Sequence, residues 1–200
     1  MEVSRKIGNR HNEGATLNNL GNIFTDMGEY EVALSYLEQS LEISRETGVL
    51  RAEGACLVGI GKIHNERGDY DRALEFFEQG LKIINVIGDR QGKGAILSHF
   101  GGIYSMQGDY ETALRYFEQS LVISHEIGDR NGMCVTLFNM GHIHYQNNDQ
   151  ENAMMHWAKS YRIAKEVGFA QVLSTLESNA QHLGGNDLSF WDAIAEKMRI

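Results

Sequence analysis

The chain has 200 residues, of which 42% are hydrophobic, and its 18 basic and 27 acidic residues leave a formal net charge of -9. This composition is sufficient for folding, and the acidic balance argues against a broad surface for nucleic acid or anionic membranes, since both require local positive charge. Cys56 and Cys134 are the only cysteines, so no disulfide framework is expected. No apolar run reaches the ~18 residues of a membrane span, and the N-terminus has no hydrophobic signal segment. We therefore expect a cytoplasmic, soluble protein without a membrane or nucleic-acid partner.

Glycine recurs with a period of 40 residues, which is typical of a stacked repeat protein. One series is Gly8, Gly48, Gly88, Gly128 and Gly168; a second is Gly21, Gly61, Gly101 and Gly141; a third is Gly28, Gly68 and Gly108. Proline is absent, so we expect glycine to end the helices in the left-handed conformation, with an acidic or amide residue after it capping the next helix.

Apolar residues at helical spacing divide each 40-residue row into two helices. The predicted pairs lie near 10–27 and 30–46, 50–67 and 70–86, 90–107 and 110–126, and 130–147 and 150–166. Glycine within the first helix of each row costs about 1 kcal/mol relative to alanine unless packing compensates. This glycine recurs in every row together with an alanine of the second helix, Ala33, Ala73 and their equivalents. The pattern indicates that small residues on both helices allow the two helix axes to approach each other closely. Leucine at Gly101 is expected to overpack this crossing by about 1–3 kcal/mol.

The two ends of the chain depart from the repeat. The segment 3–8 aligns with 43–48, the end of a second helix, so we interpret residues 1–8 as the remainder of a truncated preceding repeat in a longer array. The segment 169–185 keeps helical spacing but loses the glycine signature of the repeat. A short amphipathic helix from Asp187 to Arg199, with Phe190, Trp191, Ile194 and Met198 facing inward, is predicted to cap the array; a docking helix for another domain is the alternative. The predicted divisions are therefore 1–8, 9–48, 49–88, 89–128, 129–168 and 169–200.

The repeat resembles the tetratricopeptide repeat (TPR) family. The family's large apolar residue, Leu-Gly pair, aromatic residue, alanine and second aromatic stand in the third row as Leu97, Phe100-Gly101, Tyr104, Ala113 and Phe117. The usual repeat has 34 residues, and the longer row is similar to a subclass that includes Pins-type polarity adaptors, kinesin light chains and bacterial signalling proteins. The departures are the missing proline and, in the last row, Asn148 and Gln150 in place of Gly and Tyr. The resemblance implies an all-α, right-handed superhelical solenoid of antiparallel helix pairs.

The resemblance also implies that the first helices line a concave groove that holds a partner peptide. The residues predicted to line this groove are Asn18, Asn22, Arg51, Val58, Lys62, Asn65, Ser98, Phe138, His142 and Tyr145. The asparagine amides offer both a donor and an acceptor to an extended backbone, and the three aromatic residues of the last row offer an apolar anchor. The alternative is that these are ordinary exposed helix positions.

No enzyme, cofactor or metal site is predicted. His142 and His144 are two residues apart and so face different sides of a helix, while the other histidines lack a partner at metal-ligand spacing. No phosphate-binding loop motif occurs. The leading hypothesis is therefore a non-catalytic scaffold that binds a protein or peptide partner. Two alternatives remain: a self-assembly module that forms a homo-oligomer through the exposed array ends, and a sensory or regulatory domain of a larger signalling protein.

Overall fold

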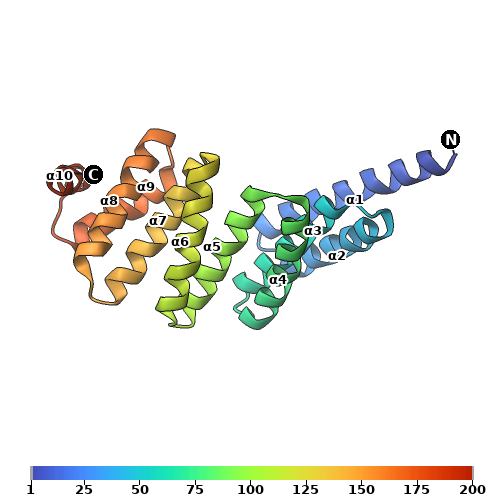
Figure 1. Cartoon of the computed structure of the whole chain (residues 1–200), viewed down its shortest axis with the longest axis horizontal. Coiled ribbons are helices and arrows are strands. Elements are labelled where there is room, and N and C mark those ends of the chain that lie inside the picture. The colour runs from blue at the N-terminus through green and yellow to red at the C-terminus, as the bar shows by residue number, and fades with distance from the viewer. Residues whose placement is uncertain (1, 200) are drawn as a thin grey trace. The chain divides into compact units, whose positions relative to one another are not determined.

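The structure, a computed structural model, describes residues 2–199, with side chains described from Asn9 onward, and this part of the chain folds into ten helices without a strand. The helices are α1 (Glu2–Asp26), α2 (Tyr30–Thr47), α3 (Leu50–Glu66), α4 (Tyr70–Ile87), α5 (Arg90–Met106), α6 (Tyr110–Ile127), α7 (Arg130–Gln146), α8 (Gln150–Val167), α9 (Ala170–His182) and α10 (Ser189–Met198). The all-α array of helix pairs predicted from the sequence is confirmed, and the helices from α2 to α8 begin and end within one residue of the expected positions (Figure 1).

The turns between helices use the glycines as predicted. Gly48, Gly88, Gly128 and Gly168 have φ values of 69 to 72° and end α2, α4, α6 and α8, a conformation that only glycine adopts without a steric cost. The shorter turns within each helix pair have Gly28, Gly68 and Gly108 in the same conformation, with φ values of 76 to 80°. In the last of these turns Asn148 replaces glycine with φ 59°, and asparagine is among the few other residues that tolerate this conformation.

Aspartates cap α4 to α8: the Asp109 carboxylate, for example, accepts a hydrogen bond from the Thr112 backbone N–H at 3.1 Å. At α2, α3 and α9 no side chain caps the helix start, since the side chains of Glu29, Val49 and Phe169 make no capping hydrogen bond.

The chain divides into two compact units between His99 and Phe100. In the first unit, α1 pairs with α2 and α3 pairs with α4, while α2 packs against α3 (Figure 1). Its core is built from the apolar stripes that the repeat predicts, and Leu37, Leu57, Ile60 and Ile63 are almost fully buried in it.

The first helix differs from the prediction at its start. A helix end was expected at Gly8, but α1 is continuous from Glu2 to Asp26 and passes through that glycine. At Gly48, Gly128 and Gly168, the next helix folds back onto the one that has just ended. Within the described chain, residues 2–8 form one helix with the residues that follow them. Whether they belong to a preceding repeat stays a prediction.

The second unit is built around two tryptophans. Trp157 of α8 and Trp191 of α10 are 2% and 0% exposed, and their rings meet edge to face with centroids 6.0 Å apart. The Trp191 Nε1–H donates to the backbone oxygen of Leu176 in α9 at 2.7 Å, so α10 is fixed to both α8 and α9. The inward face predicted for this last helix is present: Trp191 is buried, and Phe190, Ile194 and Met198 are half-buried.

Candidate functional site

A pocket of about 300 Å³ opens in the second unit between α7, α8 and α9. Its lining residues are His142, Tyr145, Gln146, Trp157, Asn179, His182 and Leu183. Six of the seven come from α7 and from α9 or its end, which are the first helices of successive pairs, and Trp157 alone comes from a second helix. The pocket therefore lies on the side of the repeat where the sequence predicts the groove.

The Trp157 ring contributes an apolar wall and is firmly held. Its Nε1–H donates to the backbone oxygen of Phe138 at 3.1 Å, and its ring contacts those of His142 and Tyr145 with centroids 5.9 and 5.5 Å away. Gly141 makes this position accessible to the indole, because a Cβ there would lie 2.5 Å from Trp157 Cδ1. Tyr145 keeps 43% of its surface exposed. The pocket thus combines a fixed aromatic wall with an exposed aromatic edge.

The polar groups of the pocket have defined hydrogen-bonding directions. Tyr110 donates its hydroxyl proton to Gln146 Oε1 at 2.6 Å, which leaves the amide Nε2–H groups of Gln146 as donors. His182 Nδ1 lies 2.7 Å from the Ser178 backbone oxygen. A carbonyl can only accept, so Nδ1 carries the proton and a neutral ring presents Nε2 as an acceptor. The Asn179 Nδ2 atom is buried and makes no hydrogen bond with any described residue. An unsatisfied buried donor carries a free-energy cost of about 1–3 kcal/mol, so this residue of the pocket lining has a donor whose hydrogen-bonding capacity is unused by the described residues.

Of the groove residues predicted in the last full repeat, two line this pocket. His142 and Tyr145 do so directly. Phe138 is half-buried, contacts His142 with ring centroids 5.9 Å apart and packs against the core of the second unit, so it supports the pocket.

The prediction missed the contributions of α8 and α9. Trp157 occupies an apolar position at helical spacing, which is typical of a core residue, and the structure shows that it belongs both to the core and to the pocket lining. Asn179 and His182 lie in the segment whose repeat signature is lost. The 40-residue period is the signal that identifies them, because His182 stands exactly one repeat after His142.

The predicted groove residues of the first unit lie on α1, α3 and α5 and do not close a comparable site. Asn22, Arg51 and Lys62 are exposed, and Asn18, Val58, Asn65 and Ser98 are half-buried. Two of them are engaged: Asn18 Oδ1 accepts a weak hydrogen bond from the Cys56 thiol at 3.6 Å, and Arg51 pairs with Asp89 at 3.5 Å. Val58 faces α4, where its Cγ2 would lie 3.3 Å from a Cβ added at Gly80. The groove role of all seven stays a prediction.

One histidine of the first unit makes stability depend on pH. The half-buried His99 ring stacks on Phe77 with centroids 4.8 Å apart, and burial, helped by the charge of Lys62, lowers the pKa of His99 to about 4. An unfolded histidine takes up its proton near pH 6.5. Between these values the unfolded chain binds more protons, so the free energy of unfolding falls as the pH drops from about 6.5 to 4.

The corresponding prediction concerns His99→Phe. Because phenylalanine keeps the ring stack without a titrating group, we expect the variant to lose less stability than the parent over this pH range, by about 1–3 kcal/mol. Urea unfolding at a series of pH values measures this difference. An identical loss of stability in both proteins would show that His99 does not contribute to it.

The described chain is an array of repeated helix pairs, with a pocket of about 300 Å³ lined mainly by residues of α7 and α9. The tetratricopeptide repeat pattern matches residues 1–46, 12–85 and 93–166, and the chain belongs to this family. A comparison with curated proteins finds no match.

Among solved structures, the chain is similar in fold to several longer proteins. Aspartyl phosphate phosphatase F from Bacillus subtilis is 18% identical with a TM-score of 0.82, over 95% of this chain and 50% of that one. A Rap protein in complex with competence and sporulation factor is 17% identical with a TM-score of 0.80, over 97% and 54%. The apo quorum sensor NprR from B. thuringiensis is 20% identical with a TM-score of 0.72, over 88% and 50%. The chain therefore spans about half the length of these proteins, and at this identity the likeness concerns the fold.

Within residues 2–199, no helix is both long and apolar enough to cross a bilayer. The described side chains include no group of three or more His, Cys, Asp and Glu residues placed to share a metal ion.

Proposed function

We propose that this chain is a non-catalytic peptide-binding module and that the pocket between α7, α8 and α9 anchors one large apolar side chain of the peptide. The observation that carries the proposal is the combination at one site of an aromatic wall, Trp157 with Tyr145, and an unpaired amide, Asn179. An anchor site needs both, because burial of the side chain supplies affinity and hydrogen bonds to the adjoining backbone fix its direction.

The size of the pocket supports a side chain as the occupant. At about 300 Å³, the pocket is at the lower end of the range for small-ligand sites. That space suits one aromatic or long aliphatic residue rather than a large cofactor. The amides of Gln146 and Asn179 lie on its border, where they can bond the main chain on either side of the anchored residue.

The similar structures agree with this proposal. One is a Rap protein complexed with competence and sporulation factor, and another is named a quorum sensor. A third is named a phosphatase; we propose no such activity here, because the pocket residues offer side-chain contacts and hydrogen bonds but no nucleophile paired with a base. A sensory or regulatory role within a larger protein is compatible with a peptide-binding module.

The test is a selection of short random peptides displayed against the chain, followed by affinity measurements on the selected sequences. We expect selected peptides to share a large apolar residue. We also expect the double variant His142→Ala with Tyr145→Ala to bind them at least about tenfold more weakly, since anchor contacts carry much of the binding free energy.

A matched control comes from α6, where Val122→Ala with His125→Ala removes an exposed apolar residue and a histidine away from the pocket. Both double variants are expected to keep the parent's far-UV circular dichroism. The proposal is wrong if the pocket variant and the control bind the selected peptides equally.

Self-assembly is supported by a separate observation on α1. Ile23 is 53% exposed, whereas the equivalent Ile63 and Ile143 are 0% and 1% exposed because α2 and α6 cover them. No described helix covers Ile23 in the same way. A homo-oligomer formed through this face would show a mass that rises with concentration in light scattering and falls in Ile23→Asp; a constant monomer mass excludes it.

A further inference from the structure

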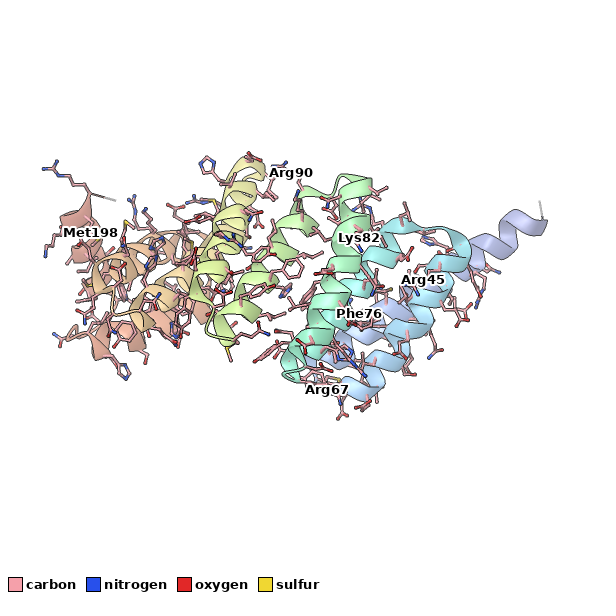
Figure 2. All side chains as sticks on the ribbon, turned by 60° about the horizontal axis from the view of Figure 1, so that its bottom comes forward. Arg45, Arg67, Phe76, Lys82, Arg90 and Met198 are labelled. Carbon is pink, nitrogen blue, oxygen red and sulfur yellow. The ribbon has the colours of Figure 1, made fainter. Side chains whose placement is uncertain are left out.

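A second concave site, separate from the peptide pocket, lies between α8 and α10. It is a groove of about 680 Å³, lined by Glu151, Asn152, Met154, Met155, Lys159, Ile194, Lys197, Met198 and Arg199. Its floor is the half-buried apolar set Met154, Met155, Ile194 and Met198, which we call the methionine groove. Figure 2 shows Met198 at the end of α10.

The two helices that form the methionine groove are joined by contacts of residues that do not line it. Asp192, near the start of α10, accepts a hydrogen bond from the Tyr161 hydroxyl at 2.9 Å and pairs with Lys165 at 3.1 Å, both in the later part of α8. The later residues of α10 then lie beside the first turns of α8. The two helices are therefore joined by contacts outside the groove as well as by its own apolar residues.

The repeat does not require the residues that give this groove its character. Met155 occupies the position of Ser35, Glu75 and Arg115 in the earlier rows, all of them exposed. Lys159 likewise occupies the position of Gln39, Gln79 and Gln119. The three earlier copies of this helix fold with serine, glutamate or arginine at the Met155 position and with glutamine at the Lys159 position. The pairing of the two helices within a repeat therefore does not require methionine and lysine at these positions.

The charge around the groove is opposite to that of the whole chain. Lys159, Lys197 and Arg199 face a single carboxylate, Glu151, and none of the three cations forms an ion pair with another described side chain. The protein as a whole carries a formal net charge of -9. Potentials that are complementary across an interface select its partner and speed association, so this local excess of positive charge favours an acidic partner.

We propose that the methionine groove binds an amphipathic acidic helix of a protein partner. Methionine side chains adapt to varied apolar surfaces, and a helix laid in a groove presents apolar residues at intervals of three and four along one face. The glutamates and aspartates on the edges of such a helix then meet Lys159 on one rim and Lys197 with Arg199 on the other. This partner is distinct from the peptide that we assign to the pocket, so either site can be disproved without the other.

The experiment uses the whole chain and three fluorescent synthetic peptides in an anisotropy titration. The first peptide has leucine at helical spacing and glutamate elsewhere; the second has lysine in place of glutamate; the third has the composition of the first with the leucine spacing scrambled. We expect binding of the first only, and affinity that decreases as salt is added. Equal binding of all three, or no binding of the first, would overturn the proposal.

The variant Met155→Ser with Lys159→Gln restores the residues that the first repeat has at these positions, so it is expected to fold. We expect it to lower the affinity for the acidic helix at least about tenfold, because it removes an apolar contact and a complementary charge together. Arg115→Ser with Gln119→Ala is the matched control on α6 and should leave the affinity unchanged. Equal affinities in both variants would contradict the assignment, as would anionic lipid vesicles binding the chain through the same two residues while the peptide does not.

Discussion

Leucine at Gly101 is expected to lower the free energy of unfolding by about 1–3 kcal/mol, whereas leucine at the adjacent Gly102 is not. A Cβ added at Gly101 would lie 2.9 Å from three atoms of the Phe117 ring, closer than real Cβ contacts allow. Phe117 is itself 1% exposed, so its ring has no free space to enter. At Gly102 no atom lies within 4 Å of the added Cβ, and replacing glycine within a helix contributes up to about 1 kcal/mol of stability.

The measurement is urea unfolding of both variants followed by far-UV circular dichroism. The two substitutions are chemically identical and lie in the same helix, so they share their effects on the unfolded chain and differ mainly in packing. A similar effect of both variants would mean that α5 and α6 do not approach each other through Gly101, and the basis of the helix pairing would be wrong.

Trp191→Ala is expected to have the largest effect on stability, about 3–5 kcal/mol in the second unit. The indole is fully buried, contacts Trp157 and Phe190 with ring centroids 6.0 and 5.0 Å away, and donates its hydrogen bond to Leu176. Alanine leaves a large cavity and removes the hydrogen bond to Leu176 at the place where α10 joins α8 and α9. We therefore expect α10 to separate before the rest of the unit, which hydrogen exchange of its amides would detect.

Trp191→Phe separates the two causes, because it keeps most of the buried ring and loses the hydrogen bond. Its cost should be smaller, about 1–3 kcal/mol. If Trp191→Ala leaves both the unfolding midpoint and the exchange of α10 unchanged, then α10 does not cap the array.

Much of the fold could be predicted because each row repeats the same physical solution. The glycines at 48, 88, 128 and 168 end their helices in the left-handed conformation, and the apolar stripes identify the buried faces. The start of the chain was less predictable. The sequence around Gly8 is compatible with a turn, but a turn forms only where the following helix can fold back onto the preceding one, and this depends on tertiary packing rather than on local sequence.

The candidate site was predicted only in part, for a related reason. His142 and Tyr145 lie on a face that the repeat defines, so their position followed from the period. Asn179 and His182 follow the same period, but the loss of the repeat's glycine signature after residue 169 obscured it. Trp157 shows a further limit, because helical spacing assigns it to the core without revealing that its ring also lines the pocket. The methionine groove was not predicted, since it depends on how α10 packs against α8.

The most direct test of the central claim, that the α7–α9 pocket anchors a peptide, is photo-crosslinking from within the pocket. A photoreactive phenylalanine analogue placed at Tyr145 should crosslink to peptides selected against the chain, while the same group at Val122, which is 56% exposed on α6, should not. Crosslinking at Val122 without crosslinking at Tyr145 would contradict the account.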